Sequence, residues 1–459
     1  MSRTQNFKNL SFDVPVVAEC DVLVIGGGPA GIAAAIASAR QQAKTMIIEQ
    51  TGCVGGMGTS ALVGPFMSNY DTSGQEEIVK GIFRELIDRM ILMNGAIDPC
   101  NVKNSSEYVS FISFCHHNCT PFDPEVLKYV AEQMLLENGV EIRYFSRLVN
   151  AQVDENDSID SIIISDKSGL VLIKASVFID CTGDGDLAAF SGQTFLQDEY
   201  VQPATLFMRI GGVDDSIVRR WAAEHMPPDK YLFESIVSKA KADGDFPADC
   251  QRESVGMYRQ PRPGEWRINT ARILGVDGTD PDSLTDAMIK GRKQLWGLLE
   301  FFKKCCPGLE NAYMIDSAAS LGVRETRRIK CKYTLTKDDV IDAVHFDDTV
   351  ARYAFFLDIH NPKGSFQENN EILFIRNGTS FEIPYRCLVA SDRSNLLIAG
   401  RCISADHQAH GATRIMPACY ATGQAAGTSA GIAIQQNKKV GDIDITLLQQ
   451  ELRKANCVL

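Results

Sequence analysis

The feature that most constrains this chain is a glycine motif near its start. Gly26, Gly28 and Gly31 have the G-x-G-x-x-G spacing. An apolar, β-branched run at residues 21–25 precedes them, and an alanine-rich segment begins at Pro29. Between a strand and a helix, such glycines allow a tight turn, close approach of the backbone to a pyrophosphate, and close packing of helix on strand. Free N–H groups at the helix start attract the same anion. The motif therefore predicts a dinucleotide site.

A second apolar run at residues 45–49 completes a β-α-β unit of about 30 residues, the size expected for this motif. It ends at Glu49, about 20 residues after Gly28, where a carboxylate accepts hydrogen bonds from ribose hydroxyls and disfavours a 2′-phosphate. We assign Gln50 to the same site. The alternative is a glycine-rich turn without a ligand, but strand, glycines, helix, second strand and acid all agree with dinucleotide binding.

Composition narrows the functions that such a unit can serve. The 459 residues include 46 Lys and Arg and 58 Asp and Glu, for a net charge of −12. This acidic balance argues against a nucleic-acid partner, because phosphate binding needs a dense basic surface. Residues 1–17 are polar, and no apolar run approaches the roughly 20 residues of a membrane span. We expect a soluble, cytoplasmic protein without membrane contact, whose 14 cysteines are mostly buried.

Later segments extend the α/β pattern. Helices are predicted at residues 76–93, 123–138 and 417–435, with Asp123 as the N-cap of the second. Strands are predicted at residues 141–145, 148–153, 161–165, 175–180 and 394–400, the first two as a pair. Residues 202–377 differ in composition, since they hold all three tryptophans and several Pro-Gly breaks. This difference predicts an inserted second domain.

Longer motifs carry a family resemblance. EQTGCVGGMGT follows the β-α-β unit, DCTGDGD ends a later strand, and GRCISADHQAHGATRIMPACYATGQAAGTSA lies near the C-terminus. With these motifs the chain resembles FAD-dependent oxidoreductases of the glutathione-reductase-like class over nearly its whole length. The resemblance implies FAD as cofactor and an α/β fold, a Rossmann-like FAD-binding domain of the glutathione-reductase type with an inserted α+β substrate or cap domain. The expected FAD-binding segments are 1–65, 121–201 and 385–459, with a cap lobe at 66–120 and the insert at 202–384.

The same resemblance assigns residues to FAD. The glycine segment at residues 55–57 is expected against the pyrophosphate and ribitol, the edge strand near Val149 at the adenine, and the turn at residues 182–184 near the adenosine. The strand ending at Gly400 approaches the ribitol, and the helix that opens near Ala418 aims its positive end at the flavin pyrimidine. The expected FAD contacts are Gly26, Gly28, Pro29, Ala30, Gly31, Glu49, Gln50, Gly55, Gly56, Met57, Val149, Thr182, Gly183, Asp184, Gly400, Arg401, Met416 and Ala418.

Two features of glutathione-reductase-type enzymes are missing from the sequence. Cys53 has no partner at the C-x-x-x-x-C spacing of a redox dithiol, and no second G-x-G-x-x-G follows for a nicotinamide cofactor. Electrons are therefore expected to enter and leave through one site, or through an unidentified donor or acceptor.

One C-terminal stretch suggests a substrate site. The run from His410 to Arg414 is similar to a stretch in succinate dehydrogenase and fumarate reductase flavoproteins, whose arginine holds a substrate carboxylate beside the flavin. The resemblance implies that Arg414 orients an anionic or carbonyl-bearing substrate. His407 and His410 are candidates for proton transfer. Alternatively, these groups contact only flavin phosphate or backbone.

The inserted region adds further candidates. Arg324 and His360 are expected to face the flavin from the cap. Arginines 324, 327, 328 and 352 either complement substrate charge or form salt bridges on a solvated face. The run Cys115-His116-His117-Asn118-Cys119 has too few ligands for a convincing zinc site, so we expect no metal. His117 is a candidate to face the substrate instead.

The expected function is therefore that of an FAD-dependent oxidoreductase, which moves a hydride between a small molecule and the N5 atom of the flavin. An alternative is a flavin-binding electron-transfer subunit of a larger complex, without a small substrate of its own. A flavoprotein that modifies RNA is disfavoured by the negative charge. Homo-oligomerisation and covalent attachment of FAD stay open.

Overall fold

The first strand, β1 (Val16–Ile25), lies inside a seven-stranded sheet of the computed structural model, which describes residues 13–114, 116–199, 201–226, 230–362 and 371–459. The strand order is β3-β2-β1-β6-β5-β4, and β17 also pairs with β6. Strands β1, β2, β3, β6 and β17 pair in parallel, whereas β4, β5 and the first half of β6 form an antiparallel meander. Residues 22–25 of β1 are buried, as expected of a strand covered on both faces.

The strands of this sheet and of the smaller sheets have the following bounds: β2 (Thr45–Ile48), β3 (Glu141–Arg143), β4 (Arg147–Val153), β5 (Ile159–Asp166), β6 (Gly169–Asp180), β7 (Phe195–Leu196), β8 (Met208–Gly211), β9 (Met257–Arg259), β10 (Trp266–Ile268), β11 (Tyr313–Ser317), β12 (Arg328–Ile329), β13 (Thr349–Tyr353), β14 (Leu357–Ile359), β15 (Glu371–Leu373), β16 (Phe381–Pro384) and β17 (Leu396–Ile398). The α-helices are α1 (Pro29–Arg40), α2 (Ile82–Leu92), α3 (Pro124–Glu137), α4 (Asp186–Phe190), α5 (Asp215–His225), α6 (Glu234–Asp243), α7 (Pro281–Cys305), α8 (Lys337–Ile341), α9 (His407–Thr413), α10 (Met416–Gln436) and α11 (Ile445–Lys454).

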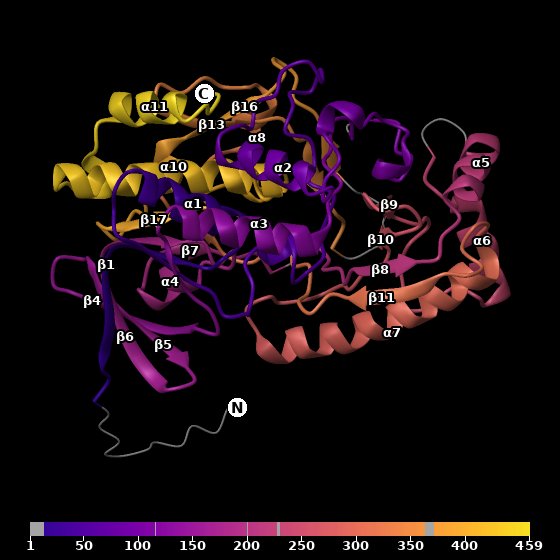
Figure 1. Ribbon diagram of the computed structural model, residues 1–459, viewed down its shortest axis with the longest axis horizontal. Coiled ribbons are helices and arrows are strands. Elements are labelled where there is room, and N and C mark those ends of the chain that lie inside the picture. The colour runs from indigo at the N-terminus through magenta and orange to yellow at the C-terminus, as the bar shows by residue number, and fades with distance from the viewer. Residues whose placement is uncertain (1–12, 115, 200, 227–229, 363–370) are drawn as a thin grey trace.

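Helices α1 and α10 join the two ends of the chain into one domain (Figure 1). A Cβ atom at Gly423 would lie 2.1 Å from the carbonyl oxygen of Ala30, and one at Gly427 would lie 2.0 Å from that of Ala34. Glycines four residues apart on α10 therefore let the two helix backbones touch, which larger residues would prevent. This contact fixes the C-terminal segment against the helix that begins at the glycine motif.

Of the region expected as an insert at 202–384, the described residues within 329–383 pack into the core of the seven-stranded sheet, whereas those within 204–323 form a second lobe with its own core. Its antiparallel sheet has the order β11-β8-β10-β9, and the long helix α7 runs beside it (Figure 1). Arg267 on β10 ties this lobe to the domain of the seven-stranded sheet, because its guanidinium donates to the carbonyl oxygens of Val63 (2.8 Å) and Phe122 (3.0 Å). The second lobe is thereby held against the segment that follows the first β-α-β unit.

The structure confirms several predicted elements and corrects others. Asp123 caps α3 by accepting a hydrogen bond from the backbone N–H of Glu125, as predicted. The helix predicted at residues 76–93 begins only at Ile82, after Gly81, whose φ is +59°. The pairing of 141–145 with 148–153 is wrong: β3 follows α3 back to the sheet and pairs in parallel with β2, whereas β4 pairs with β5.

Two other expectations concern the ends and the membrane. The expectation for the N-terminal segment is not tested at residues 1–12, which lie outside the described residues. Among the described helices, none combines the length and the apolar composition that a membrane crossing requires.

Candidate functional site

The three motif glycines have the geometry that their spacing predicted. Gly26 has a φ of +101°, and a Cβ there would lie 2.6 Å from the carbonyl oxygen of Cys181. A Cβ at Gly31 would lie 1.8 Å from the carbonyl oxygen of Gly26, so helix and loop touch. At Gly28, by contrast, no atom outside the adjacent residues lies within 4 Å of the Cβ position. The loop is therefore closed on its inner side and open at Gly28, as an approaching pyrophosphate requires.

The start of α1 offers N–H groups to an anion. Gly28 is its N-cap residue, no side chain caps the helix, and the first turn holds no acidic residue. Pro29 and Ala30 are both buried in this first turn. A second glycine segment borders the loop, since Gly55 N–H donates to the carbonyl oxygen of Gly27 (2.8 Å) and a Cβ at Gly56 would lie 2.9 Å from Gly28 Cα. The two segments together form a backbone-lined cradle.

Glu49 lies at the rim of this cradle. Its Oε2 accepts a hydrogen bond from the Gly27 N–H (2.7 Å), and its Oε1 accepts from the N–H of Thr51 (2.8 Å). The carboxylate is thus held beside the glycine loop, where a ribose would bring its hydroxyls. Gln50 is exposed, and Val149 is 40% exposed on β4, the outer strand of the same sheet.

The turn after β6 and the end of β17 meet next to the cradle. Asp184 Oδ1 accepts hydrogen bonds from Arg401 (2.8 Å) and from the Thr326 hydroxyl (2.9 Å). Thr182 lies against Gly26, and the guanidinium of Arg401 lies close to Gly183. Gly400 has a φ of +87°, and a Cβ there would lie 2.9 Å from the Cβ of Ala30. The predicted FAD residues of five separate segments are thus brought together around the loop.

Helix α10 presents a second uncapped N-terminus. Ile415 is its N-cap residue, no side chain caps it, and Ile415 and Met416 both line a cavity. Met57 lines the same cavity, whereas Ala418 is fully buried in the helix. The positive end of the helix dipole therefore faces the cavity, which favours negative charge there. The open position at Gly28, the two uncapped helix ends and Glu49 fit an FAD molecule.

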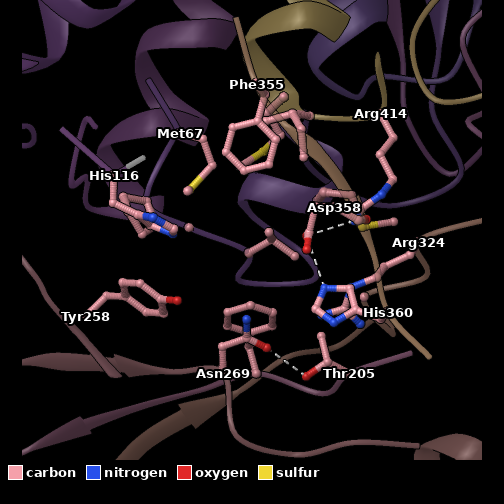
Figure 2. A pocket seen from close by; sticks show the side chains of 18 of the residues that line it. Met67, His116, Thr205, Tyr258, Asn269, Arg324, Phe355, Asp358, His360 and Arg414 are labelled. Atoms are coloured by element: carbon pink, nitrogen blue, oxygen red, sulfur yellow. Dashed lines mark hydrogen bonds and ion pairs between the residues drawn. The ribbon is translucent and has the colours of Figure 1, made fainter. Parts of the chain in front are cut away.

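The cavity has a volume of about 220 Å³ and lies between the glycine-loop domain and the second lobe. The charged side chains of its described lining are four arginines, Arg252, Arg324, Arg401 and Arg414, and one aspartate, Asp358. Figure 2 shows Arg414, Arg324, Asp358 and His360 on one side of it, and Met67, His116 and Tyr258 on the other. Apolar side chains, among them Ile112, Phe355 and Phe356, cover much of the remaining wall.

Asp358 lies at the centre of the cationic side. Its Oδ2 accepts hydrogen bonds from His360 Nε2 (3.0 Å) and from Arg414 Nη2 (3.2 Å). Burial alone would raise the pKa of Asp358, but His360 and the two arginines hold it well below its ordinary range. Burial lowers the pKa of His360 to about 3, so at neutral pH a neutral imidazole donates to an ionised carboxylate.

Arg324 and Arg414 are buried cations. Burial, with Arg414 as the main neighbouring charge, lowers the pKa of Arg324 to about 9. Arg324 donates to the carbonyl oxygen of Pro203. Burial likewise lowers the pKa of Arg414, and its Nε has no hydrogen-bond partner among the described residues. Unpaired donors at buried guanidinium groups are costly, so this side of the cavity is suited to an anion.

The structure separates the predicted catalytic residues into two groups. Arg414, Arg324 and His360 line the cavity, whereas His407 and His410 are absent from its described lining. His410 is fully buried with Nε2 2.9 Å from the carbonyl oxygen of Arg401, and burial lowers its pKa to about 3. The face of α9 that carries both histidines thus points away from the cavity.

The structure also places the four arginines of the inserted region and one group of potential metal ligands. Arg327 and Arg328 form ion pairs with Asp186 and Glu325, and Arg352 donates to the Ser380 hydroxyl, so of that group only Arg324 reaches the cavity. Glu325, Asp198 and His407 bring potential metal ligands within 4.8 Å of one another, but the Arg328 guanidinium already forms an ion pair with each of the two carboxylates.

The segment 115–119 contributes a residue that sequence reasoning missed. Cys115 lies outside the described residues, so the zinc hypothesis is not tested there. His117 Nε2 lies 3.3 Å from the carbonyl oxygen of Asp71 and does not line the cavity, whereas its neighbour His116 does. Arg252, Tyr258 and Asp358 were also missed, because nothing in their local sequence distinguishes them.

A model of the FAD-dependent oxidoreductase family matches residues 21–452. No curated protein matches the chain. Among solved structures, a geranylgeranyl bacteriochlorophyll reductase-like protein from Thermoplasma acidophilum is 15% identical, with a TM-score of 0.46, over 96% of this chain and 84% of that one.

Two further structures are similar at the same level. The p-nitrophenol 4-monooxygenase from Pseudomonas putida is 12% identical, with a TM-score of 0.47, over 95% of this chain and 84% of that one. The L-proline dehydrogenase from P. horikoshii is 11% identical, with a TM-score of 0.45, over 97% of this chain and all of that one. These likenesses concern the fold alone. The family match over most of its length identifies the chain as a member of the FAD-dependent oxidoreductase family, an enzyme with FAD as its cofactor.

Proposed function

We propose that this enzyme transfers a hydride between a small anionic molecule and the N5 atom of its flavin. The observation that carries the proposal is the cationic side of the cavity, where Arg324 and Arg414 are buried beside a single aspartate of the described lining. FAD supplies the two-electron chemistry when it is bound. The cationic side supplies the affinity and orientation of a carboxylate.

Each residue has a role that follows from its contacts. Arg414 is fixed by Asp358 and presents the rest of its guanidinium to the substrate as a fork. Arg324 adds a second positive charge from the inserted domain. His360, neutral and hydrogen-bonded to Asp358, holds that carboxylate in place. Phe355 and Phe356 exclude water from the reacting atoms.

The finer assignments belong to the same proposal. The domain that holds FAD is of the glutathione-reductase type, and the run from His410 to Arg414 corresponds to the fumarate-reductase stretch. Support comes from the position of Arg414 in the cavity and from the convergence of the predicted FAD residues around the glycine loop. In this assignment His410 positions Arg401 through its backbone and moves no proton.

The test is anaerobic reduction of the bound flavin by small molecules. The panel contains carboxylic acids that bear a CH–OH or CH–NH group, and the neutral amide of each acid. We expect one or more acids to bleach the oxidised-flavin band, their amides to fail, and Arg414→Gln to abolish the response. Arg386→Gln, which removes an exposed arginine paired with Asp348, is the matched control and leaves the response unchanged.

An electron-transfer subunit is the second candidate. It is favoured by the sequence, which contains neither a redox dithiol nor a second glycine motif for a nicotinamide cofactor. If no acid reduces the flavin and a protein electron donor does, the subunit is the correct interpretation and the hydride-transfer proposal is wrong.

A further inference from the structure

We infer that the substrate is an amphipathic acid, with a carboxylate at the arginine side of the cavity and an apolar body against the opposite wall. The inference rests on the proposed function, because it names the class of molecule that the same site takes. It goes further in requiring an apolar body, which excludes small dicarboxylates and other fully polar acids.

The polarity of the cavity is divided in space. Arg324 and Arg414 lie together on one side of Figure 2, and Met67 lies on the other. Thr205 and Asn269 line the floor and are hydrogen-bonded to each other (3.1 Å), so they already satisfy part of their polar capacity. A ligand that crosses the cavity therefore meets the two arginines at one end and, at the other, Met67 with the polar tips of His116 and Tyr258 beside it.

The apolar wall is built from packed aromatic rings. Phe355 and Phe356 are stacked with centroids 4.2 Å apart and are only 4% and 7% exposed. Phe356 is also 6.4 Å from the ring of His116, and Ile112 is 9% exposed on the same cavity. Covering such a surface with the apolar part of a ligand removes apolar area from water, which favours binding.

The cationic side requires the other end of the ligand to be negative. Burial and the neighbouring charge of Arg414 lower the pKa of Arg324, and Asp358 is the one acidic side chain in the described lining. A bound carboxylate relieves this repulsion and supplies acceptors for the buried N–H groups. An ammonium group at the same place would add to the repulsion. A neutral alcohol would offer one acceptor without charge.

The test measures binding without turnover. Three probes with the same body are titrated into the FAD-loaded enzyme, and the perturbation of the flavin spectrum or the heat of binding is recorded: 3-phenylpropanoate, 3-phenylpropan-1-ol and 3-phenylpropan-1-amine. Acetate serves as the head group without a body. We expect the acid to bind at least tenfold more tightly than the alcohol and than acetate, and the amine not to bind.

Matched variants assign the two ends. Arg324→Gln and Arg414→Gln are expected to remove the preference for acid over alcohol, Phe356→Ala to remove the preference for 3-phenylpropanoate over acetate, and Arg386→Gln to change neither. Equal binding of acid and alcohol, or of 3-phenylpropanoate and acetate, overturns the inference. Because no reduction is required, acids that bind but never reduce the flavin would refute the proposed function while leaving the ligand class in place.

A separate observation concerns the proton that accompanies the hydride. We infer that His116 exchanges this proton through Nε2. Its Nδ1 lies 2.9 Å from the carbonyl oxygen of Phe114, and a carbonyl accepts only from a protonated ring nitrogen, so the lone pair is on Nε2. His116 is 8% exposed and lines the cavity opposite the arginines (Figure 2).

The electrostatics of His116 suit a base. Burial lowers its pKa below the ordinary value, Asp358 opposes the shift and His117 adds to it, so the ring is neutral at pH 7. His360 already uses Nε2 for Asp358. In the oxidising direction the C–H electron pair leaves as hydride to N5, the O–H or N–H proton goes to His116 Nε2, and a C=O or C=N bond forms.

The position of His116 places the reacting hydroxyl or amine on the body of the acid, away from its carboxylate. The probe pair is therefore 3-hydroxy-3-phenylpropanoate and 3-phenylpropanoate. We expect the hydroxy acid to bind about three- to tenfold more tightly, as one added hydrogen bond predicts. The advantage is lost in His116→Gln and kept in His117→Gln.

A direct readout of the tautomer completes the test. Long-range ¹H–¹⁵N correlation spectra of the FAD-loaded enzyme, labelled at histidine nitrogen, are expected to place the His116 proton on Nδ1 at pH 7. Comparison with His116→Gln assigns the signal. A proton on Nε2, or a hydroxyl advantage that survives in His116→Gln, overturns the role of His116.

Discussion

Around the glycine loop, the exposed groups are mostly backbone, because Gly26, Gly28 and Gly56 have no side chains and no side chain caps the start of α1. Across the cavity, the interacting groups are side chains from distant parts of the chain, such as His116, Asp358 and Arg414. In the function proposed above, the first region binds FAD through features that local sequence specifies. The second region would recognise the substrate through an arrangement that only the tertiary fold creates.

The variant with the largest expected effect tests whether the backbone of the glycine loop binds FAD. Gly28→Ala adds a methyl group where no atom outside the adjacent residues lies within 4 Å and where φ is −74°, so the apoprotein should keep its Tm. The methyl occupies the approach of the pyrophosphate, and we expect FAD binding to be lost. The measurement is the flavin-to-protein absorbance ratio after desalting, together with the Tm of the apoprotein.

Gly31→Ala is the contrasting variant. Its Cβ would lie 1.8 Å from the carbonyl oxygen of Gly26, so it must displace the loop itself. We expect Tm to fall as well, because overpacking costs about 1–3 kcal/mol or more. If both variants kept their FAD, the loop would not hold the cofactor.

The next largest effect is expected at a side chain of the cavity. His116→Gln is expected to slow flavin reduction by the most effective acid of the panel about 10²- to 10⁴-fold, the usual contribution of a general base. In the wild type the rate should fall as the pH drops through the lowered pKa of His116, because the protonated ring cannot accept a proton. The variant should lack this decline. A wild-type rate that is independent of pH on the acid side would contradict the assignment.

Arg414→Lys gives a smaller effect, because the charge stays and only the fork is lost. A lysine cannot hold Asp358 and a substrate carboxylate with parallel N–H groups. We expect kcat/KM to fall about tenfold, with most of the loss in KM, against a larger loss for Arg414→Gln. Equal kinetics for the lysine variant and the wild type would mean that charge alone matters at this position.

The same contrast separates the features that could be predicted from the sequence from those that could not. The glycine spacing, the position of Glu49 and the Asp123 cap were all readable, because each depends on neighbours within one or two elements. The pairing of β3 was misread, since the choice of partner depends on the α3 crossover that returns β3 to the sheet beside β2. A local sequence pattern predicts that a strand or helix forms, but it does not specify which elements lie beside it.

The cavity shows why the remaining site residues were harder to find. Asp358 and His116 lie 242 positions apart in number, and no periodicity or motif links them. His407 and His410 illustrate the opposite error: both were candidates for proton transfer, but α9 turns them toward Glu325 and the backbone of Arg401. The family resemblance therefore pointed to Arg414, which lines the cavity, whereas the two histidines chosen for their chemistry are absent from its described lining.

The smallest expected effect, that of His407→Gln, tests this last distinction. His407 Nδ1 lies 2.8 Å from Glu325, which raises the pKa of the imidazole, and the residue is partly exposed. A raised pKa in the folded state stabilises the protein at pH values below the unfolded pKa, and that contribution disappears as the pH rises through the folded pKa. The variant should therefore show a small fall in Tm at pH 6 and almost none at pH 9, while probe binding and flavin reduction stay at wild-type levels. A loss of flavin reduction at both pH values, with Tm unchanged, would return His407 to the catalytic group and remove the division between motif and cavity that the structure indicates.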